Sequence, residues 1–218
     1  MTAPRFIDEP QVPQRKSHYV DVIDYPVEDP LGGEGTYTGS LSQLSGEPCG
    51  KGRLDFSDGV SHYDGEFIHG IWAGRGNLKN QQGDCYSGYF LDNLRHGEGT
   101  MRYSDGRCFK GLFERDALVE GIMYYHDGAT YEGQFKHGKR SGKGVYCFRD
   151  GSVYEGSWKN DQYHGVGELQ WSNGARFFGE WRHGIKHGFG REFDAGGDIR
   201  HKGIWRDGFL DVFYEVPQ

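Results

Sequence analysis

The sequence has no long hydrophobic run. Its apolar stretches extend over only a few residues, whereas a membrane-spanning helix needs about 20. The N-terminal segment MTAPRFIDEPQVPQRK also lacks the apolar stretch of a secretory signal. We therefore expect an intracellular protein.

The sequence also has few cysteines and no excess of positive charge. The four cysteines show no CxxC spacing and are expected to be free thiols: Cys49, Cys85, Cys108 and Cys147. Lys and Arg total 25 against 32 Asp and Glu, which gives a net charge of −7 with both signs scattered along the chain. Such a surface repels nucleic acid, so we expect no nucleic-acid partner. The local exception is KHGKRSGK, Lys136 to Lys143, which fits a solvated turn.

Glycine, in contrast, is abundant and periodic. It supplies 37 of the 218 residues, about 17% where average proteins have about 7%. An aromatic-x-Gly element recurs at intervals of 23, 23, 22, 23 and 23 residues, beginning at Tyr63, Tyr86, Phe109, Tyr131, Tyr154 and Phe177. A looser copy begins at Tyr37 and a truncated one near His201. The chain therefore contains seven full repeat units and one partial unit.

Each unit is predicted to form a β-hairpin. In the unit that begins at Tyr154, the residues Tyr154, Gly156 and Trp158 share one face because side chains alternate along a strand. Asp-Gly and Asn-Gly pairs between the alternating segments are strong signals for tight turns. Glycine weakens a strand, so its regular use indicates close packing. We expect the aromatic rings to lie over bare glycine backbone when the hairpins stack.

This pattern resembles the membrane occupation and recognition nexus (MORN) family, whose unit reads YxGxWxxGxxxGxG. One unit matches it with Phe in place of Trp, at Tyr131, Gly133, Phe135, Gly138, Gly142 and Gly144. The match extends from about Tyr37 to Gly208. The resemblance implies an all-β fold, an elongated and twisted single-layer antiparallel β-meander of hairpin repeats.

The repeats also suggest how the chain is divided. Residues 1–32 contain five of the seven prolines and no repeat, and are expected to be an N-terminal arm in which His18 to Tyr25 pairs as a strand. Residues 33–208 are expected to form the repeat sheet. Residues 209–218, with the segment FLDVFYEV, are expected to form a C-terminal cap.

Two units depart from the pattern. In the Phe109 unit one residue is missing and Val119 replaces the first glycine of the Gly-x-Gly pair, so a local change of twist is expected. In the Phe177 unit Glu192 and Asp194 occupy positions that are apolar elsewhere, as expected where a repeat array meets its cap.

Phosphate and metal sites are not expected. GKRSGKG, Gly138 to Gly144, resembles a phosphate loop but has three residues instead of four between its glycines, and no Ser or Thr follows Lys143. Histidines recur at equivalent places, but successive hairpins lie about 10 Å apart, which favours polar turn residues over metal ligands: His69, His96, His137, His164, His183 and His187. The same spacing argues against a Cys85 to Cys108 disulfide.

Catalysis is not expected either. No Ser-His-Asp arrangement stands out, and the regularly placed carboxylates, such as Glu132, Glu155 and Glu180, are interpreted as cross-strand charge ladders with Lys136, Lys159 and Arg182. MORN relatives carry methyltransferase or lipid kinase domains, but about ten residues follow the last unit here. We expect a non-enzyme without catalytic residues, metal or cofactor.

Function is expected on the face that carries the rings. A single sheet has two faces, and large apolar surfaces are rarely left open, so the chain's own arms, a second copy in a homodimer or another protein could cover this one. Alternatively, the rings pack on glycine and one another as a thin core. The predicted partner-binding residues are Tyr63, Phe67, Tyr86, Phe90, Tyr131, Phe135, Tyr154, Trp158, Phe177 and Trp181.

The family resemblance suggests two settings. Short chains made almost wholly of these repeats resemble the radial spoke head proteins of cilia and flagella, which implies a scaffold in the axoneme that docks other spoke head subunits. The alternative is a membrane-apposed module that binds acidic phospholipids through Lys136, Lys139, Arg140 and Lys143. The negative net charge and the lack of an anchor oppose membrane attachment.

Overall fold

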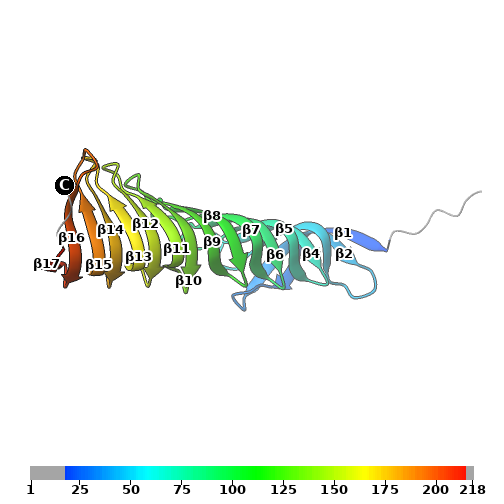
Figure 1. Ribbon diagram of the computed structural model, residues 1–218. Coiled ribbons are helices and arrows are strands. Elements are labelled where there is room, and N and C mark those ends of the chain that lie inside the picture. The colour runs from blue at the N-terminus through cyan, green and yellow to red at the C-terminus, as the bar shows by residue number, and fades with distance from the viewer. Residues whose placement is uncertain (1–17, 215–218) are drawn as a thin grey trace, which may run out of the picture.

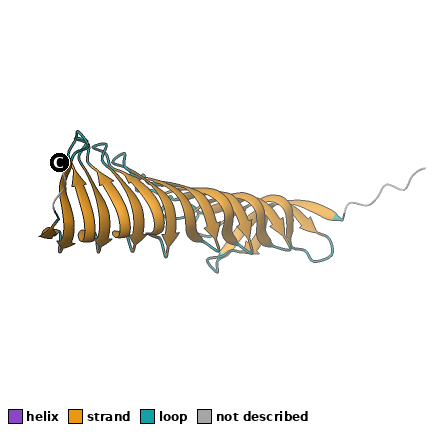
Figure 2. Cartoon of the chain, viewed as in Figure 1, coloured by secondary structure: helices purple, strands orange, loops and turns teal. Residues whose placement is uncertain are grey.

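The computed structural model describes residues 18–214, which form one sheet of seventeen strands (Figures 1 and 2). The strands are β1 (Tyr19–Glu28), β2 (Glu34–Ser42), β3 (Pro48–Asp55), β4 (His62–Ile68), β5 (Ile71–Lys79), β6 (Cys85–Leu91), β7 (Leu94–Arg102), β8 (Cys108–Glu114), β9 (Ala117–Tyr124), β10 (Thr130–Lys136), β11 (Lys139–Cys147), β12 (Val153–Lys159), β13 (Gln162–Gln170), β14 (Arg176–Arg182), β15 (Ile185–Phe193), β16 (Ile199–Arg206) and β17 (Phe209–Phe213). The described chain contains no helix, and hence none that could cross a membrane. The predicted all-β fold is confirmed.

The sheet is a meander in which each strand pairs antiparallel with its neighbours in sequence, from β1 to β17. Successive strands lie side by side along an elongated, twisted sheet (Figure 1). Because every pairing is local in sequence, each unit contacts only the units beside it.

Two kinds of turn join the strands. Turns inside a unit have positive φ at both central residues, as at His137 (52°) and Gly138 (72°), which is the geometry that suits the twist of a two-residue hairpin. Most turns between units use the predicted Asp-Gly or Asn-Gly pairs, and two use Gln82-Gly83 and Gly196-Gly197 instead. At one of the Asp-Gly turns the Gly106 amide donates to the Tyr103 carbonyl. His69, His137 and His183 are thus turn residues, as expected. The turn prediction is wrong for His96, His164 and His187, which lie within β7, β13 and β15 because they come just before the bulge glycine in the strand.

The two glycines of each Gly-x-Gly pair have different tasks. The first has φ between 59° and 69° in most units and lies at a β-bulge; Gly142 (66°) is an example. The second pairs directly with the glycine of the aromatic-x-Gly element, as Gly144 does with Gly133. A Cβ on either Gly133 or Gly144 would collide with the Tyr131 ring. The ring-over-glycine prediction is confirmed, with each ring covering glycines of its own hairpin.

The divergent Phe109 unit has a smaller bulge. In other units two extra residues separate the glycine pair from the next register pair, whereas here only Val119 is extra, between Glu120 (paired with Leu112) and Leu118 (paired with Phe113). A one-residue bulge needs no glycine at this point, and Val119 is not among the residues with positive φ. The 22-residue spacing therefore reflects a local change in the bulge.

Terminal strands extend the repeat sheet on both sides. β1 pairs with β2 through Tyr19–Glu28, so the strand expected within the N-terminal arm exists and joins the sheet. β17 pairs with β16 and covers the last repeat. The rest of the expected arm, up to residue 17, and the last four residues of the expected cap lie outside the described residues.

Candidate functional site

The ring face of the sheet is closed. All ten aromatic residues predicted to bind a partner are at most 8% exposed, and together with other buried side chains they form one continuous core: Tyr63, Phe67, Tyr86, Phe90, Tyr131, Phe135, Tyr154, Trp158, Phe177 and Trp181. Neighbouring rings meet edge to face, as Tyr131 does with Phe135 at 5.1 Å between centroids. The thin-core alternative describes these rings, and we assign them no partner contact.

In five units a second side chain also lies against the face of the repeated ring. Trp72 stacks on Tyr63 at 4.5 Å between centroids, and Tyr163 stacks on Tyr154 at 3.7 Å. In the last full unit the Lys186 ammonium lies 4.6 Å from the Phe177 ring centre. In these units the covering residue stands two places before the first glycine of the Gly-x-Gly pair. This position was overlooked in the sequence because its chemistry changes from unit to unit.

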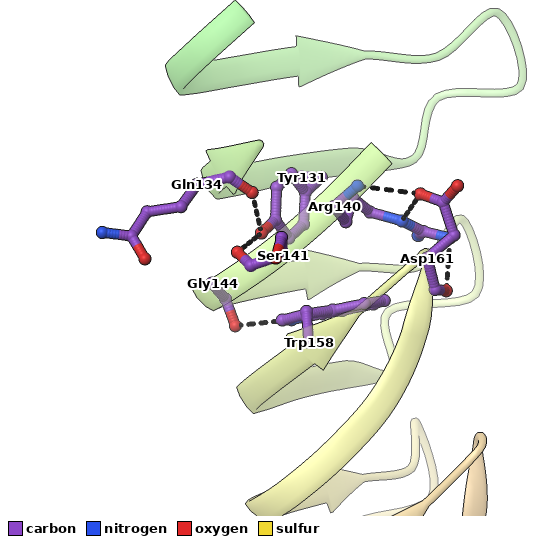
Figure 3. A network of polar contacts seen from close by, with 7 residues as sticks. All are labelled: Tyr131, Gln134, Arg140, Ser141, Gly144, Trp158 and Asp161. Carbon is purple, nitrogen blue, oxygen red and sulfur yellow. Dashed lines mark hydrogen bonds and ion pairs between the residues drawn. The ribbon is translucent and has the colours of Figure 1, made fainter. Parts of the chain in front are cut away.

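Arg140 performs this covering role in the unit of Tyr131 (Figure 3). Its guanidinium lies 4.5 Å from the Trp158 ring centre and 5.9 Å from that of Tyr131, and its Nε is 3.1 Å from the Asp161 carboxylate. Burial raises the pKa of the Tyr131 hydroxyl, which stays protonated and donates to the Gln134 carbonyl at 2.9 Å.

The four cations proposed for lipid binding therefore do not form one patch. Arg140 pairs in register with Phe135 and lies on the ring face, whereas Lys136 and Lys139 pair with each other on the opposite face. The side chain of Arg140 is only 20% exposed and already paired with Asp161. The expectation that Arg140 joins the three lysines in a lipid-binding turn is wrong, because its charge is used inside the fold.

The opposite face carries a groove. Its floor is a row of glycines, one from each strand from β2 to β16, paired in unbroken register: Gly39, Gly52, Gly65, Gly76, Gly88, Gly99, Gly111, Gly121, Gly133, Gly144, Gly156, Gly167, Gly179, Gly190 and Gly203. The residues before and after each glycine point away from the rings and form two walls. Two hollows of about 810 and 900 Å³ lie along this floor, over β3–β8 and β9–β14.

Comparison with protein families agrees with this architecture. The MORN repeat model matches residues 44–61, 63–85, 86–106, 131–153, 154–176 and 177–199, which is more than half of the chain. The chain belongs to the MORN repeat family. The family model does not match the divergent unit at Phe109. The structure nevertheless shows this MORN unit as hairpin β8–β9 in the same sheet.

Other comparisons add little. No curated protein matches this MORN chain. Among solved structures, the TCP domain of Drosophila melanogaster SAS-4, in complex with a proline-rich motif of Ana2, has a TM-score of 0.37 and 10% identity, covering 91% of this chain and 96% of that one. The TCP10 domain of Danio rerio CPAP has a TM-score of 0.21 and 14% identity, covering 83% and 99%. These likenesses are too weak to define a shared overall shape.

The two halves of the MORN groove differ in charge. The half over β3–β8 is balanced, with three cations and three anions: Lys51, Arg75, Lys110, Asp64, Glu66 and Glu98. The half over β9–β14, here called the acidic groove, combines four carboxylates with exposed apolar side chains: Glu120, Glu132, Glu155, Glu168, Val166 and Phe178. Lys143 is the single cation among the residues that line it.

The carboxylates of the acidic groove do not form the expected charge ladders. Glu132 pairs in register with Val145 and Ile122, and Glu155 pairs with Val145 and Glu168. Within residues 18–214, Glu132 and Glu155 have no ion pair, and Glu168 has a long one of 3.5 Å to Arg176. Glu180 pairs in register with Val166 and His187 and also has no ion pair among these residues. The ladder interpretation is therefore wrong for Glu132, Glu155 and Glu180, because register places no cation directly opposite them.

Proposed function

We propose that this MORN protein is a non-catalytic scaffold that docks protein partners along its glycine-floored groove. The observation that carries the proposal is the contrast between the two faces. The ring face is packed to at most 8% exposure at its repeated aromatic residues, whereas Val166 and Phe178 on the groove wall remain 49% and 46% exposed. A rigid sheet with exposed apolar and charged walls suits the binding of an elongated partner.

The proposed setting is a cytoskeletal assembly of radial spoke head type in the axoneme of a cilium or flagellum. Support comes from the plan of the chain, in which one repeat sheet fills nearly all of the described residues. Such a subunit would contribute rigid length and a docking surface, with other spoke head proteins as its partners.

Fractionation of ciliated source cells tests this setting. We expect the native protein to remain with detergent-insoluble axonemes and to leave them only in strong salt. Recovery with membranes or in the soluble fraction would contradict it. The lysine-rich turn at Lys136 and Lys139 would then require direct tests with acidic vesicles.

Groove variants test the docking surface itself. Val166→Ser with Phe178→Ser removes the apolar contacts at exposed wall positions without adding charge, so the fold is expected to persist while retention on axonemes falls. Ile68→Ser with Leu91→Ser is the matched control, because these side chains are also 60% and 46% exposed but do not line the groove. Equal retention of both double variants would exclude the groove as the docking surface.

A further inference from the structure

The acidic groove has the composition of a site for a positively charged segment. It holds four carboxylates against one lysine, while the balanced half of the same groove holds three charges of each sign. Floor, strand order and pairing are the same in both halves. The two halves therefore differ in charge only through their wall side chains, and this charge determines which bound segment is favoured between the walls.

Two of the carboxylates face each other at a cost to the sheet. Glu155 on β12 and Glu168 on β13 are direct register partners, and like charges in directly opposed positions destabilise a sheet. Among the described residues, Glu155 has no cation within ion-pair distance, and the ion pair of Glu168 is the 3.5 Å contact with Arg176. The strand ends do carry Lys159 and Arg182, but these residues are not among those that line the groove. A cation placed between Glu155 and Glu168 from outside would relieve their repulsion.

The dimensions of the groove favour an extended chain. Wall residues on one strand, such as Val166 and Glu168, are two positions apart, or roughly 6.6 Å, which is narrower than the 10–12 Å diameter of a helix with its side chains. From β9 to β14 there are five strand spacings of about 4.8 Å, or roughly 24 Å in all. An extended segment of about seven residues spans this length.

The apolar wall side chains add a second requirement. Val166 and Phe178 are half exposed within this acidic surrounding and offer contacts to aliphatic side chains. A segment with basic residues alone would leave them uncovered. The occupant should therefore interleave cations with apolar residues.

We propose that the acidic groove binds an extended segment of a partner protein, about seven residues long, in which Lys or Arg alternates with aliphatic residues. This inference rests on the proposed docking function and specifies the chemistry of the docked segment. Arginine is favoured over lysine, because its planar guanidinium bridges two carboxylates such as Glu155 and Glu168.

A short synthetic probe tests this inference with the full chain. The probe is a fluorescein-labelled eight-residue peptide that alternates Arg and Val, and its binding is followed by fluorescence anisotropy at about 0.15 M salt. Two control peptides replace Arg by Glu, or Val by Ser. We expect saturable binding of the Arg-Val peptide, no binding of the Glu-Val peptide and binding at least about tenfold weaker for the Arg-Ser peptide.

Matched variants locate the binding. Glu132→Gln with Glu155→Gln keeps the shape of both side chains and is expected to weaken binding of the Arg-Val peptide by about tenfold or more. Glu66→Gln with Glu98→Gln removes the same charge from the balanced half, and a change of less than about twofold is expected there. The melting temperature of the Glu132 and Glu155 variant should not fall, because one like-charge pair is removed.

Absence of probe binding, equal binding of the Arg-Ser peptide, or equal weakening by both pairs of variants would overturn the inference. These outcomes are distinct from failure of the proposed function, which is decided by retention of the wild-type protein on axonemes. A protein that is retained but does not bind the probe keeps its docking role and uses a segment of different chemistry. If the protein binds the probe but is not retained on axonemes, the inference on the groove holds and the proposed axonemal setting is contradicted.

Discussion

The substitution Gly144→Ala tests whether the aromatic rings are the reason that the row of paired positions needs glycine. Gly144 has no positive φ, so alanine is compatible with its backbone. A Cβ at this position would nevertheless lie no more than 2.6 Å from Oη, Cε2 and Cζ of Tyr131. All three nearest atoms belong to the Tyr131 side chain, which is therefore the main obstacle to the Cβ.

The Tyr131 ring has little freedom to move away. It is 0% exposed, its hydroxyl donates to the Gln134 carbonyl at 2.9 Å, and Phe135 and Trp158 touch its edges at 5.1 and 5.2 Å between centroids. Overfilling a packed core costs about 1–3 kcal/mol, and loss of the hydrogen bond adds about 1 kcal/mol. We expect Gly144→Ala to lower the free energy of unfolding by about 2–4 kcal/mol.

The assay is denaturant unfolding followed by tryptophan fluorescence, with Gly196→Ala as the control. A Cβ at Gly196 would meet only the Asp194 carboxylate at 3.3 Å, so this variant should stay within about 0.5 kcal/mol of the wild type. A double-mutant cycle with Tyr131→Leu should give a coupling of at least about 1 kcal/mol, since a smaller side chain makes room for the Cβ. Additivity of the two changes would refute the assignment of this glycine to the ring.

Three further outcomes are expected. Burial alone would raise the pKa of Asp29, but hydrogen bonds from Ser57, Gly33 and Leu31 lower it to about 2, so Asp29 stabilises the fold above pH about 5 and this contribution is lost as the pH falls toward 2. Unfolding measured at pH 7 and pH 3 should therefore differ less in Asp29→Asn than in the wild type. Arg140→Met should lower stability by about 1–2 kcal/mol in denaturant unfolding but leave binding to acidic vesicles unchanged, because the guanidinium is held inside the fold. Thiol titration without denaturant should reach the exposed cysteines first, and non-reducing mass analysis should show no disulfide.

The fold could be predicted because its signal is periodic. The 23-residue interval, the alternation and the Asp-Gly turns specify hairpins that follow one another along the chain, and the structure confirms this order. Even the short unit is informative, since its missing residue corresponds to the smaller bulge at Val119. Local sequence is sufficient here because each strand pairs with its sequence neighbours.

The rings that the sequence predicts to contact a partner are buried for a physical reason. Alternation shows which residues share a face, but not how completely that face is covered. Cover comes from Trp72, Tyr163, Arg140 and Lys186, which share a position but no chemistry. Each closes a ring by stacking or by a cation–π contact, and a pattern search by residue type does not group them.

Charge was misjudged for a related reason. The sequence places glutamate and lysine at regular intervals along each strand, which suggested ladders. Register decides which charges meet, and the bulge in hairpin β12–β13 shifts the register so that Glu155 faces Glu168. On its other side Glu155 faces Val145. An alternation pattern alone does not include this shift.

The glycine row explains how one sheet can be both rigid and adaptable. On the ring face the glycines from Gly39 to Gly190 are required, because a Tyr or Phe side chain occupies the space of the Cβ. A Cβ at these positions would point to the ring face, so the groove floor is bare backbone, and the walls beside it do not take part in the core. Wall residues such as Glu132 and Val166 can therefore change with little effect on stability, while they determine what the groove accepts. Substitutions in the walls of single repeat units can therefore change the charge of each half of the groove while the fold is kept.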